Sequence, residues 1–134
     1  MSATHTRITT VPFEQVCRRL PEVAAKHKFS VLGVHDLREK LVSKGFPFAR
    51  ECRVFEVCSP QQAHQILSNS IEVASALPCR IAAYTEDGRT VLSTIKPEAL
   101  LGLYSAKGGE QGAREVDASL IAIMDETCAG GAPG

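Results

Sequence analysis

The dipeptide Asp87-Gly88 constrains the fold of this chain more than any other feature. It lies between two segments that favour β-structure, residues 79–86 and 89–95, and Asp-Gly is typical of two-residue hairpin turns. The resulting register places Cys79 opposite Lys96, a cation that would favour the thiolate. One face of the hairpin would carry Cys79, Ile81, Ala83, Leu92, Thr94 and Lys96, and the other Arg80, Ala82, Tyr84, Val91, Ser93 and Ile95. The pattern does not distinguish the buried face from the exposed one.

A further strand is predicted over residues 50–58, and a helix starts directly after it. Ser59 is the expected N-cap, Pro60 occupies the first helical position, and Gln62 would reach back to the cap as in a capping box. Cys58 precedes this cap. Its side chain would either pack there as a small apolar group or have its thiol pKa lowered by free backbone N–H groups and the helix dipole.

The remaining segments predict an α+β fold with a mainly antiparallel sheet. Strands are expected at 5–10, as an edge strand, and at 29–35, where Gly33 marks a bulge or a close backbone approach. A helix begins after Pro12, and Pro21 should kink or split it. The hairpin and the absence of long apolar strands argue against a parallel sheet, so we expect the helices on one face of a single domain.

The C-terminal third is expected to be less regular. Residues 1–104 form the predicted domain core, and the glycine-rich residues 105–114 predict a mobile connector. An amphipathic helix over 115–127 should pack on the same domain. Residues 128–134 predict a disordered tail in which Cys128 is an exposed thiol. Upstream, Phe46-Pro47-Phe48 predicts a packed loop in preference to a ligand-stacking platform.

Composition restricts the class of protein. The 134 residues suffice for one domain with its own core. Lys and Arg total 15, as do Asp and Glu, so no global field attracts nucleic acid or an anionic membrane. The N-terminus shows no charged-then-apolar leader, and no apolar run approaches the roughly 18 residues of a membrane span. We therefore expect a soluble cytoplasmic protein without nucleic-acid or membrane partners, whose five cysteines stay reduced.

Several motifs resemble a known family. They are the strings Val54–Pro60 (VFEVCSP), Leu77–Tyr84 (LPCRIAAY) and Lys96-Pro97. Together these motifs resemble the family described as domain of unknown function 302, with a match over roughly residues 5 to 104. The resemblance implies a small α+β domain with an antiparallel sheet and helices on one side, similar to TATA-binding-protein-like folds. It also implies a tendency to form homodimers, and it implies no agreed activity.

The candidate site residues gather around the two cysteines at the element ends. No nucleophile elbow, phosphate-cradling glycine loop, Cys-x-x-Cys motif or histidine pair at metal spacing is present, so catalysis is not expected. Cys58, Cys79 and His64 would suit a soft metal or haem iron. Two buried cysteines and a surface histidine also need no ligand at all. The cofactor-binding candidates are Cys58, Pro60, His64, Cys79, Arg80 and Lys96.

Two hypotheses of different classes remain. The first is a homodimeric, non-catalytic module that binds a small ligand or cofactor near Cys58 and the Pro78-Cys79 turn. The alternative is a thiol-based redox, sulfur-transfer or metal- and haem-handling protein, in which Cys58 is the activated thiolate and Cys79 its resolving or co-ligating partner. The two hypotheses differ in the state of the thiols, because only the second needs a lowered pKa.

Overall fold

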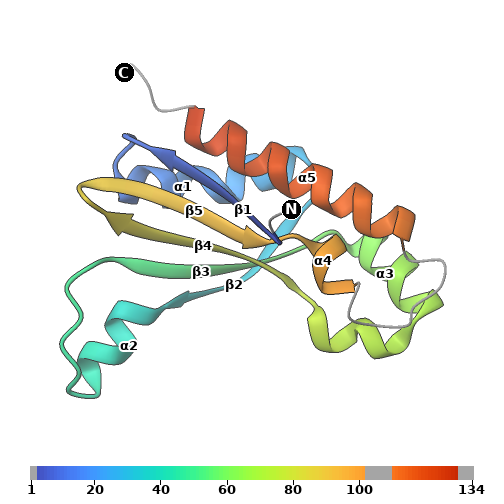
Figure 1. The fold of residues 1–134 in the computed structure, drawn as a ribbon, viewed down its shortest axis with the longest axis horizontal. Coiled ribbons are helices and arrows are strands. Elements are labelled where there is room, and N and C mark those ends of the chain that lie inside the picture. The colour runs from blue at the N-terminus through green and yellow to red at the C-terminus, as the bar shows by residue number, and fades with distance from the viewer. Residues whose placement is uncertain (1–2, 102–109, 130–134) are drawn as a thin grey trace.

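In the part of the chain that the structure describes, five strands form one antiparallel sheet in the order β1-β5-β4-β3-β2 (Figure 1). The computed structural model describes residues 3–101 and 110–129. The strands are β1 (Thr4–Thr9), β2 (Ser30–Asp36), β3 (Cys52–Cys58), β4 (Cys79–Glu86) and β5 (Arg89–Ile95). All neighbouring pairs are antiparallel, which confirms the predicted α+β fold class and its five strand positions.

The predicted hairpin joins β4 and β5. Glu86 pairs with Arg89 across the turn, and both turn residues have positive φ, 51° at Asp87 and 77° at Gly88. Such a turn matches the right-handed twist of the two strands, and glycine adopts the second position without steric cost. The hairpin therefore fixes which side chains of β4 and β5 share a face.

One face of the sheet is buried beneath helices. Its core side chains come from the three inner strands: Phe55 and Val57 on β3, Cys79, Ile81 and Ala83 on β4, and Leu92 on β5. Helices α1 (Phe13–Lys26), α3 (Pro60–Asn69) and α5 (Glu110–Ala129) contribute the opposing apolar residues. We call the other side of the sheet, which faces away from α1 and α5 in Figure 1, the open face.

Helix α1 is continuous, so the expected break at Pro21 does not occur. Proline removes one backbone hydrogen bond from a helix interior. Buried side chains on both sides of Pro21, Leu20 before it and Val23 after it, belong to the same core. Packing of this single apolar stripe holds the two halves of the helix in one register.

The C-terminal helix is longer than the sequence predicted. Residues 110–114, expected in the connector, are helical, and α5 continues to Ala129. Cys128 is buried, contrary to its predicted place in a disordered tail, because α5 packs along β1 and the Thr9 hydroxyl donates to the Cys128 carbonyl at 3.0 Å. Residues 105–109 of the expected connector and 130–134 of the expected tail lie outside the described residues.

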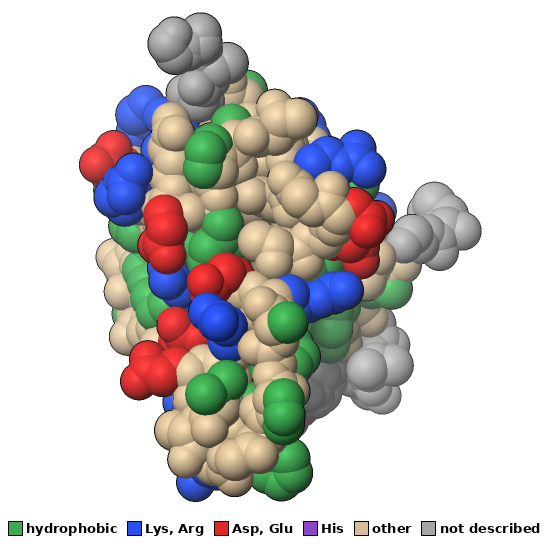
Figure 2. Space-filling model, turned by 90° about the vertical axis from the view of Figure 1, so that its left-hand side faces the viewer, with side chains coloured by type: hydrophobic (Ala, Val, Ile, Leu, Met, Phe, Trp, Pro, Cys, Tyr) green, Lys and Arg blue, Asp and Glu red, His purple; other side chains and the backbone are tan. Residues whose placement is uncertain are grey.

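A short helix, α2 (Leu37–Ser43), projects from the end of the sheet at β2 and β3 (Figure 1). Asp36 caps it by accepting a hydrogen bond from the Glu39 backbone N–H at 2.9 Å. None of its residues is buried. Phe46, in the loop that follows, is 62% exposed, so the predicted packed loop is wrong at this position. Figure 2 shows this end of the molecule, where hydrophobic side chains gather on the projecting part.

Two further short helices, η1 (Ile71–Ala76) and α4 (Pro97–Leu101), flank the ends of β4 and β5 farthest from the hairpin turn. No helix in the described part of the chain is long and apolar enough to cross a membrane.

The buried face should dominate stability. Ile81 is fully buried in the central strand β4, whereas Ile8, on the edge strand β1, is 52% exposed. We expect Ile81→Ala to lower the free energy of unfolding by about 3 kcal/mol, because it removes buried methylene groups and leaves a cavity. The matched change Ile8→Ala should cost less than about 1 kcal/mol. Urea denaturation of both variants measures the difference, and equal losses would contradict the one-sided core.

Candidate functional site

The β4–β5 ladder stops before the ends of its strands. Its register pairs extend from the turn to Ala82 and Ser93. Beyond this point the Thr94 hydroxyl donates to the Arg80 carbonyl at 2.7 Å, so a side chain satisfies a carbonyl near the end of the ladder. The predicted pairing of Cys79 with Lys96 is absent from this ladder. At the same end of the sheet, Ile95 pairs with Thr4 of β1.

A hollow of about 250 Å³ lies where the pairing of β4 with β5 ends. It takes its walls from β3, β4, β5, η1 and α4 together with the turn before β4. The lining residues are Val54, Ala76, Pro78, Cys79, Arg80, Ala82, Ser93, Thr94, Ile95 and Leu100. Val54 and Ala82 face each other across the β3–β4 ladder, and Ala82 faces Ser93 across β4–β5. Because Val54, Ala82 and Ser93 have small side chains, space remains above them, and η1 and α4 border this space.

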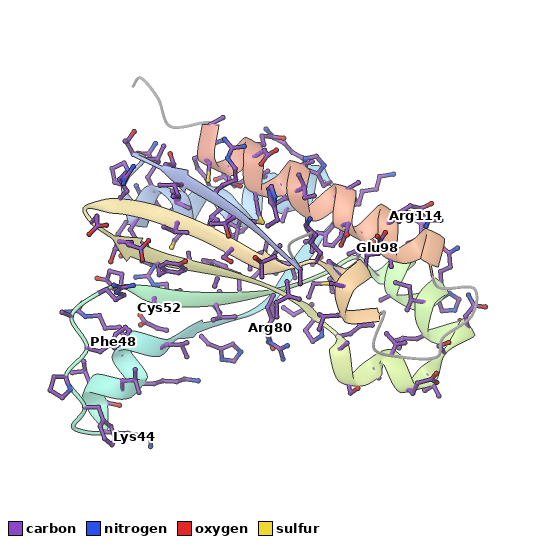
Figure 3. All side chains as sticks on the ribbon, in the orientation of Figure 1. Lys44, Phe48, Cys52, Arg80, Glu98 and Arg114 are labelled. Atoms are coloured by element: carbon purple, nitrogen blue, oxygen red, sulfur yellow. The ribbon has the colours of Figure 1, made fainter. Side chains whose placement is uncertain are left out.

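Arg80 carries the only charge among the described residues that line the hollow. Its side chain is 57% exposed and extends on the open face, away from α1 and α5 (Figure 3). Arg80 Nη2 lies 3.9 Å from Glu56 Oε2, and the other oxygen of Glu56 lies 3.2 Å from His35 Nε2. Glu56 is thus shared between a neighbouring imidazole and a more distant guanidinium.

The backbone of β2 accommodates Glu56. The register between β2 and β3 shifts between Val31 and Gly33, which is the bulge predicted at this glycine. A Cβ at Gly33 would lie 3.0 Å from Glu56 Oε1. Any larger residue at position 33 would therefore displace the Glu56 carboxylate, so this glycine also provides the predicted close approach.

The two candidate thiols line a second, much smaller cavity on the helix side. Cys58 and Cys79 border a volume of about 20 Å³, together with Ser59, Gln62 and apolar side chains. This space holds about one water molecule, which is too little for a haem. Burial raises the pKa of the Cys58 thiol, and it raises the pKa of Cys79 to about 11, with a smaller contribution from Cys58. Of the two roles that the sequence left open for Cys58, the rise in pKa agrees with a packed thiol and not with one whose pKa the helix start lowers.

The helix start is capped as predicted, with one difference. The Gln62 backbone N–H donates to the Ser59 hydroxyl at 3.3 Å, and Pro60 occupies the first turn. The reciprocal bond from the Gln62 side chain to the cap is not made. Gln62 Oε1 is instead buried without a hydrogen-bond partner among the described residues. Ser59 therefore provides the side-chain cap alone.

The structure brings together only part of the predicted site. Cys58 and Cys79 share the small cavity, and Cys79 and Arg80 share the hollow. Pro60 and His64 are exposed on α3 and line neither space. No group of three His, Cys, Asp or Glu side chains in the described residues is arranged to hold a metal ion. Cys58, Cys79 and His64 therefore do not form the ligand set that the sequence left open as one possibility.

Lys96 also departs from its predicted role. Its backbone N–H donates to the Ala3 carbonyl at 2.8 Å, and its own carbonyl accepts from the first turn of α4. The Lys96 charge acts on Asp117 of α5, where it opposes the rise in the carboxyl pKa that burial causes. It is not among the groups that shift Cys79. Lys96 therefore belongs to the junction of β5, α4 and α5.

Of the ten residues that line the hollow, the sequence had placed only Pro78, Cys79 and Arg80 at the candidate site. The predicted hairpin register had placed Arg80, Ala82, Ser93 and Ile95 on one face. This grouping could have identified them as neighbours in one site. Leu100, contributed by α4, carried no comparable signal because its position depends on tertiary packing.

These features define a one-domain α+β protein with a half-covered antiparallel sheet and a hollow on the uncovered side. Residues 5–127 match the family model described as "Domain of unknown function DUF302", and the chain belongs to that family. It is similar to the protein described as "Crystal structure of uncharacterized conserved protein DUF302 from Bacillus stearothermophilus". That likeness has a TM-score of 0.91 and 29% sequence identity, and it covers 96% of this chain and 99% of that one. No curated protein matches the sequence.

The raised thiol pKa of Cys79 predicts a pH dependence of stability. The thiol would ionise near pH 9 in the unfolded chain but only near pH 11 in the native protein. Between these values the native state binds more protons, so the free energy of unfolding should fall as pH rises, by roughly 2–3 kcal/mol from this thiol.

Cys79→Ala provides the comparison. Urea denaturation between pH 8 and pH 11 should show a shallower decline for Cys79→Ala than for the wild type, because the substituted side chain has no proton to lose. Parallel declines in the two proteins would show that Cys79 is not held neutral by burial.

Proposed function

We propose that the protein is a non-catalytic binding module that holds a small molecule in the hollow on the open face. The hollow itself carries this proposal. It is lined mainly by apolar side chains and contains a few polar groups, Arg80, Ser93 and Thr94, which is the usual make-up of a small-molecule site. Pockets for drug-sized ligands have volumes of roughly 300–1,000 Å³, so a hollow of about 250 Å³ fits a smaller molecule.

The position of the hollow supports the same function. It opens on the side of the sheet that α1 and α5 leave uncovered, so a ligand can enter without disturbing the core. It also adjoins a wholly apolar pocket beneath α4, since Ala76, Cys79 and Leu100 line both. A bound molecule would thus contact the sheet and the short helices together.

Thiol chemistry has weaker support. The thiolate is the nucleophilic and metal-binding form of cysteine, and burial raises the pKa of both Cys58 and Cys79. These thiols are therefore better suited to packing than to redox or sulfur transfer. Cys79 contributes to the proposed site as a wall residue.

Filling the hollow tests this function. Ala82→Phe places a ring on the open face inside the hollow, whereas Ile8→Phe places one on the same face outside it. Native mass spectrometry of protein purified from its own host should show a retained small molecule on the wild type and on Ile8→Phe. Ala82→Phe should lose it, with a stability change within about 0.5 kcal/mol. The proposal would be contradicted if the wild-type mass showed no retained molecule, or if Ala82→Phe still retained one.

A homodimer is the second part of the proposed function. Among the described residues, no strand pairs with the outer edge of β1 or of β2, and proteins commonly cover such edges. Side chains of β1 contact α5, since Arg7 Nη1 lies 2.7 Å from Asp125 Oδ1. At β2, Leu32 and Val34 are 60% and 49% exposed. Packing β2 against a second copy would bury this apolar surface through a two-fold contact.

The dimer can be tested at that edge. Sedimentation velocity at micromolar concentration should give a dimer for the wild type. Leu32→Lys should yield monomers, because it places an ammonium group in the apolar contact, while Ile8→Lys on the opposite edge should leave the dimer intact. A wild-type monomer would exclude the homodimer, and a dimeric Leu32→Lys would exclude this face.

A further inference from the structure

The charge at the rim of the hollow narrows the class of ligand. We propose that the ligand is a small amphipathic anion, whose anionic group binds Arg80 while its aliphatic body lies over Val54 and Ala82. This inference rests on the proposed function and specifies the chemistry of the same site.

Arg80 is available to such a ligand. Its exposed guanidinium is 3.9 Å from Glu56, a longer separation than the 2.7 Å of Arg7–Asp125 or Arg53–Glu14. An exposed pair at this separation contributes little to stability. Arginine binds carboxylates through two parallel hydrogen bonds, which a long single contact does not use. A ligand carboxylate can therefore replace Glu56 at Arg80 at small cost.

Glu56 does not lose its other neighbour when this exchange occurs. His35 Nε2 remains 3.2 Å from Glu56 Oε1 on the side away from Arg80, and Lys40 Nζ lies 3.4 Å from the other ring nitrogen of His35. The bulge at Gly33 leaves the carboxylate room on that side. Glu56 is thus held at the border of the hollow but is not one of its lining residues.

The rest of the lining favours an aliphatic body. Val54, Ala82, Ile95 and Leu100 present hydrocarbon, and half of Ile95 is exposed. Covering these side chains removes apolar surface from water. The Thr94 hydroxyl already donates to the Arg80 carbonyl, and the Ser93 hydroxyl lies 3.4 Å from Thr6 Oγ1. Arg80 is therefore the main polar group that the lining offers to a ligand. One cation beside an apolar floor matches a monoanion better than a sugar or a polyanion.

Four probes separate the contributions of charge and hydrocarbon: octanoate, octanamide, octylammonium and acetate. Isothermal titration calorimetry on the wild-type protein, freed of retained molecules, should show the tightest binding for octanoate. Octanamide lacks the charge and acetate lacks the hydrocarbon, so each should bind at least about tenfold more weakly. Octylammonium, which would face Arg80, should bind most weakly of the three eight-carbon probes.

Two substitutions should change octanoate affinity in opposite directions. Arg80→Gln should weaken it about tenfold, because the charge-assisted hydrogen bonds are lost, while the matched change Arg89→Gln at the hairpin turn should have no effect. Glu56→Gln should tighten binding about threefold, since it removes the carboxylate that competes for Arg80. The gain in Glu56→Gln cannot arise from misfolding.

The outcomes also separate this inference from the function on which it rests. Three results would each contradict the proposal of an anionic ligand. They are equal octanoate affinity in Arg80→Gln and the wild type, tighter binding of octanamide or octylammonium than of octanoate, and no binding of any probe. If Ala82→Phe still abolished a retained molecule, the hollow would remain the binding site for another class of ligand. If the wild type retained nothing, the binding function itself would fail.

Discussion

One-sided burial of the five-stranded sheet is the constraint on which the rest of this structure depends. Side chains alternate along a strand, so burying Ile81 and Phe55 beneath the helices places Ala82 and Val54 on the opposite side. The Asp87-Gly88 turn fixes this assignment for two strands at once, because a shift of one residue would exchange the faces. The open face is therefore a direct consequence of how the core is built.

The hollow arises where this regular pairing ends. The β4–β5 ladder departs from regular pairing beyond Ala82 and Ser93, where the Thr94 hydroxyl donates to the Arg80 carbonyl. The carbonyl is satisfied, so the departure costs little. The hollow lies beside this departure and is bordered by η1 and α4. The candidate site is thus found where the regular β4–β5 pairing ends.

Sequence patterns predicted the sheet well because its periodicity and turn chemistry are local. They placed all five strands, the Ser59 cap and the bulge at Gly33. They failed where tertiary packing decides the outcome: burial keeps α1 continuous through Pro21 and covers Cys128. For the site, alternation grouped Arg80 with Ala82. Lys96 was assigned by extending the hairpin register beyond Ser93, and His64 by its position in the helix after Cys58, but neither lines the hollow.

The central claim is that a ligand binds on the open face at the end of the β4–β5 ladder. The most direct measurement is amide chemical-shift mapping by NMR during titration with octanoate. We predict the largest shifts at Arg80, Ala82 and Ser93, with little change at Ser59 and His64. Shifts centred on Ser59 and His64, or spread evenly over the sheet, would contradict it.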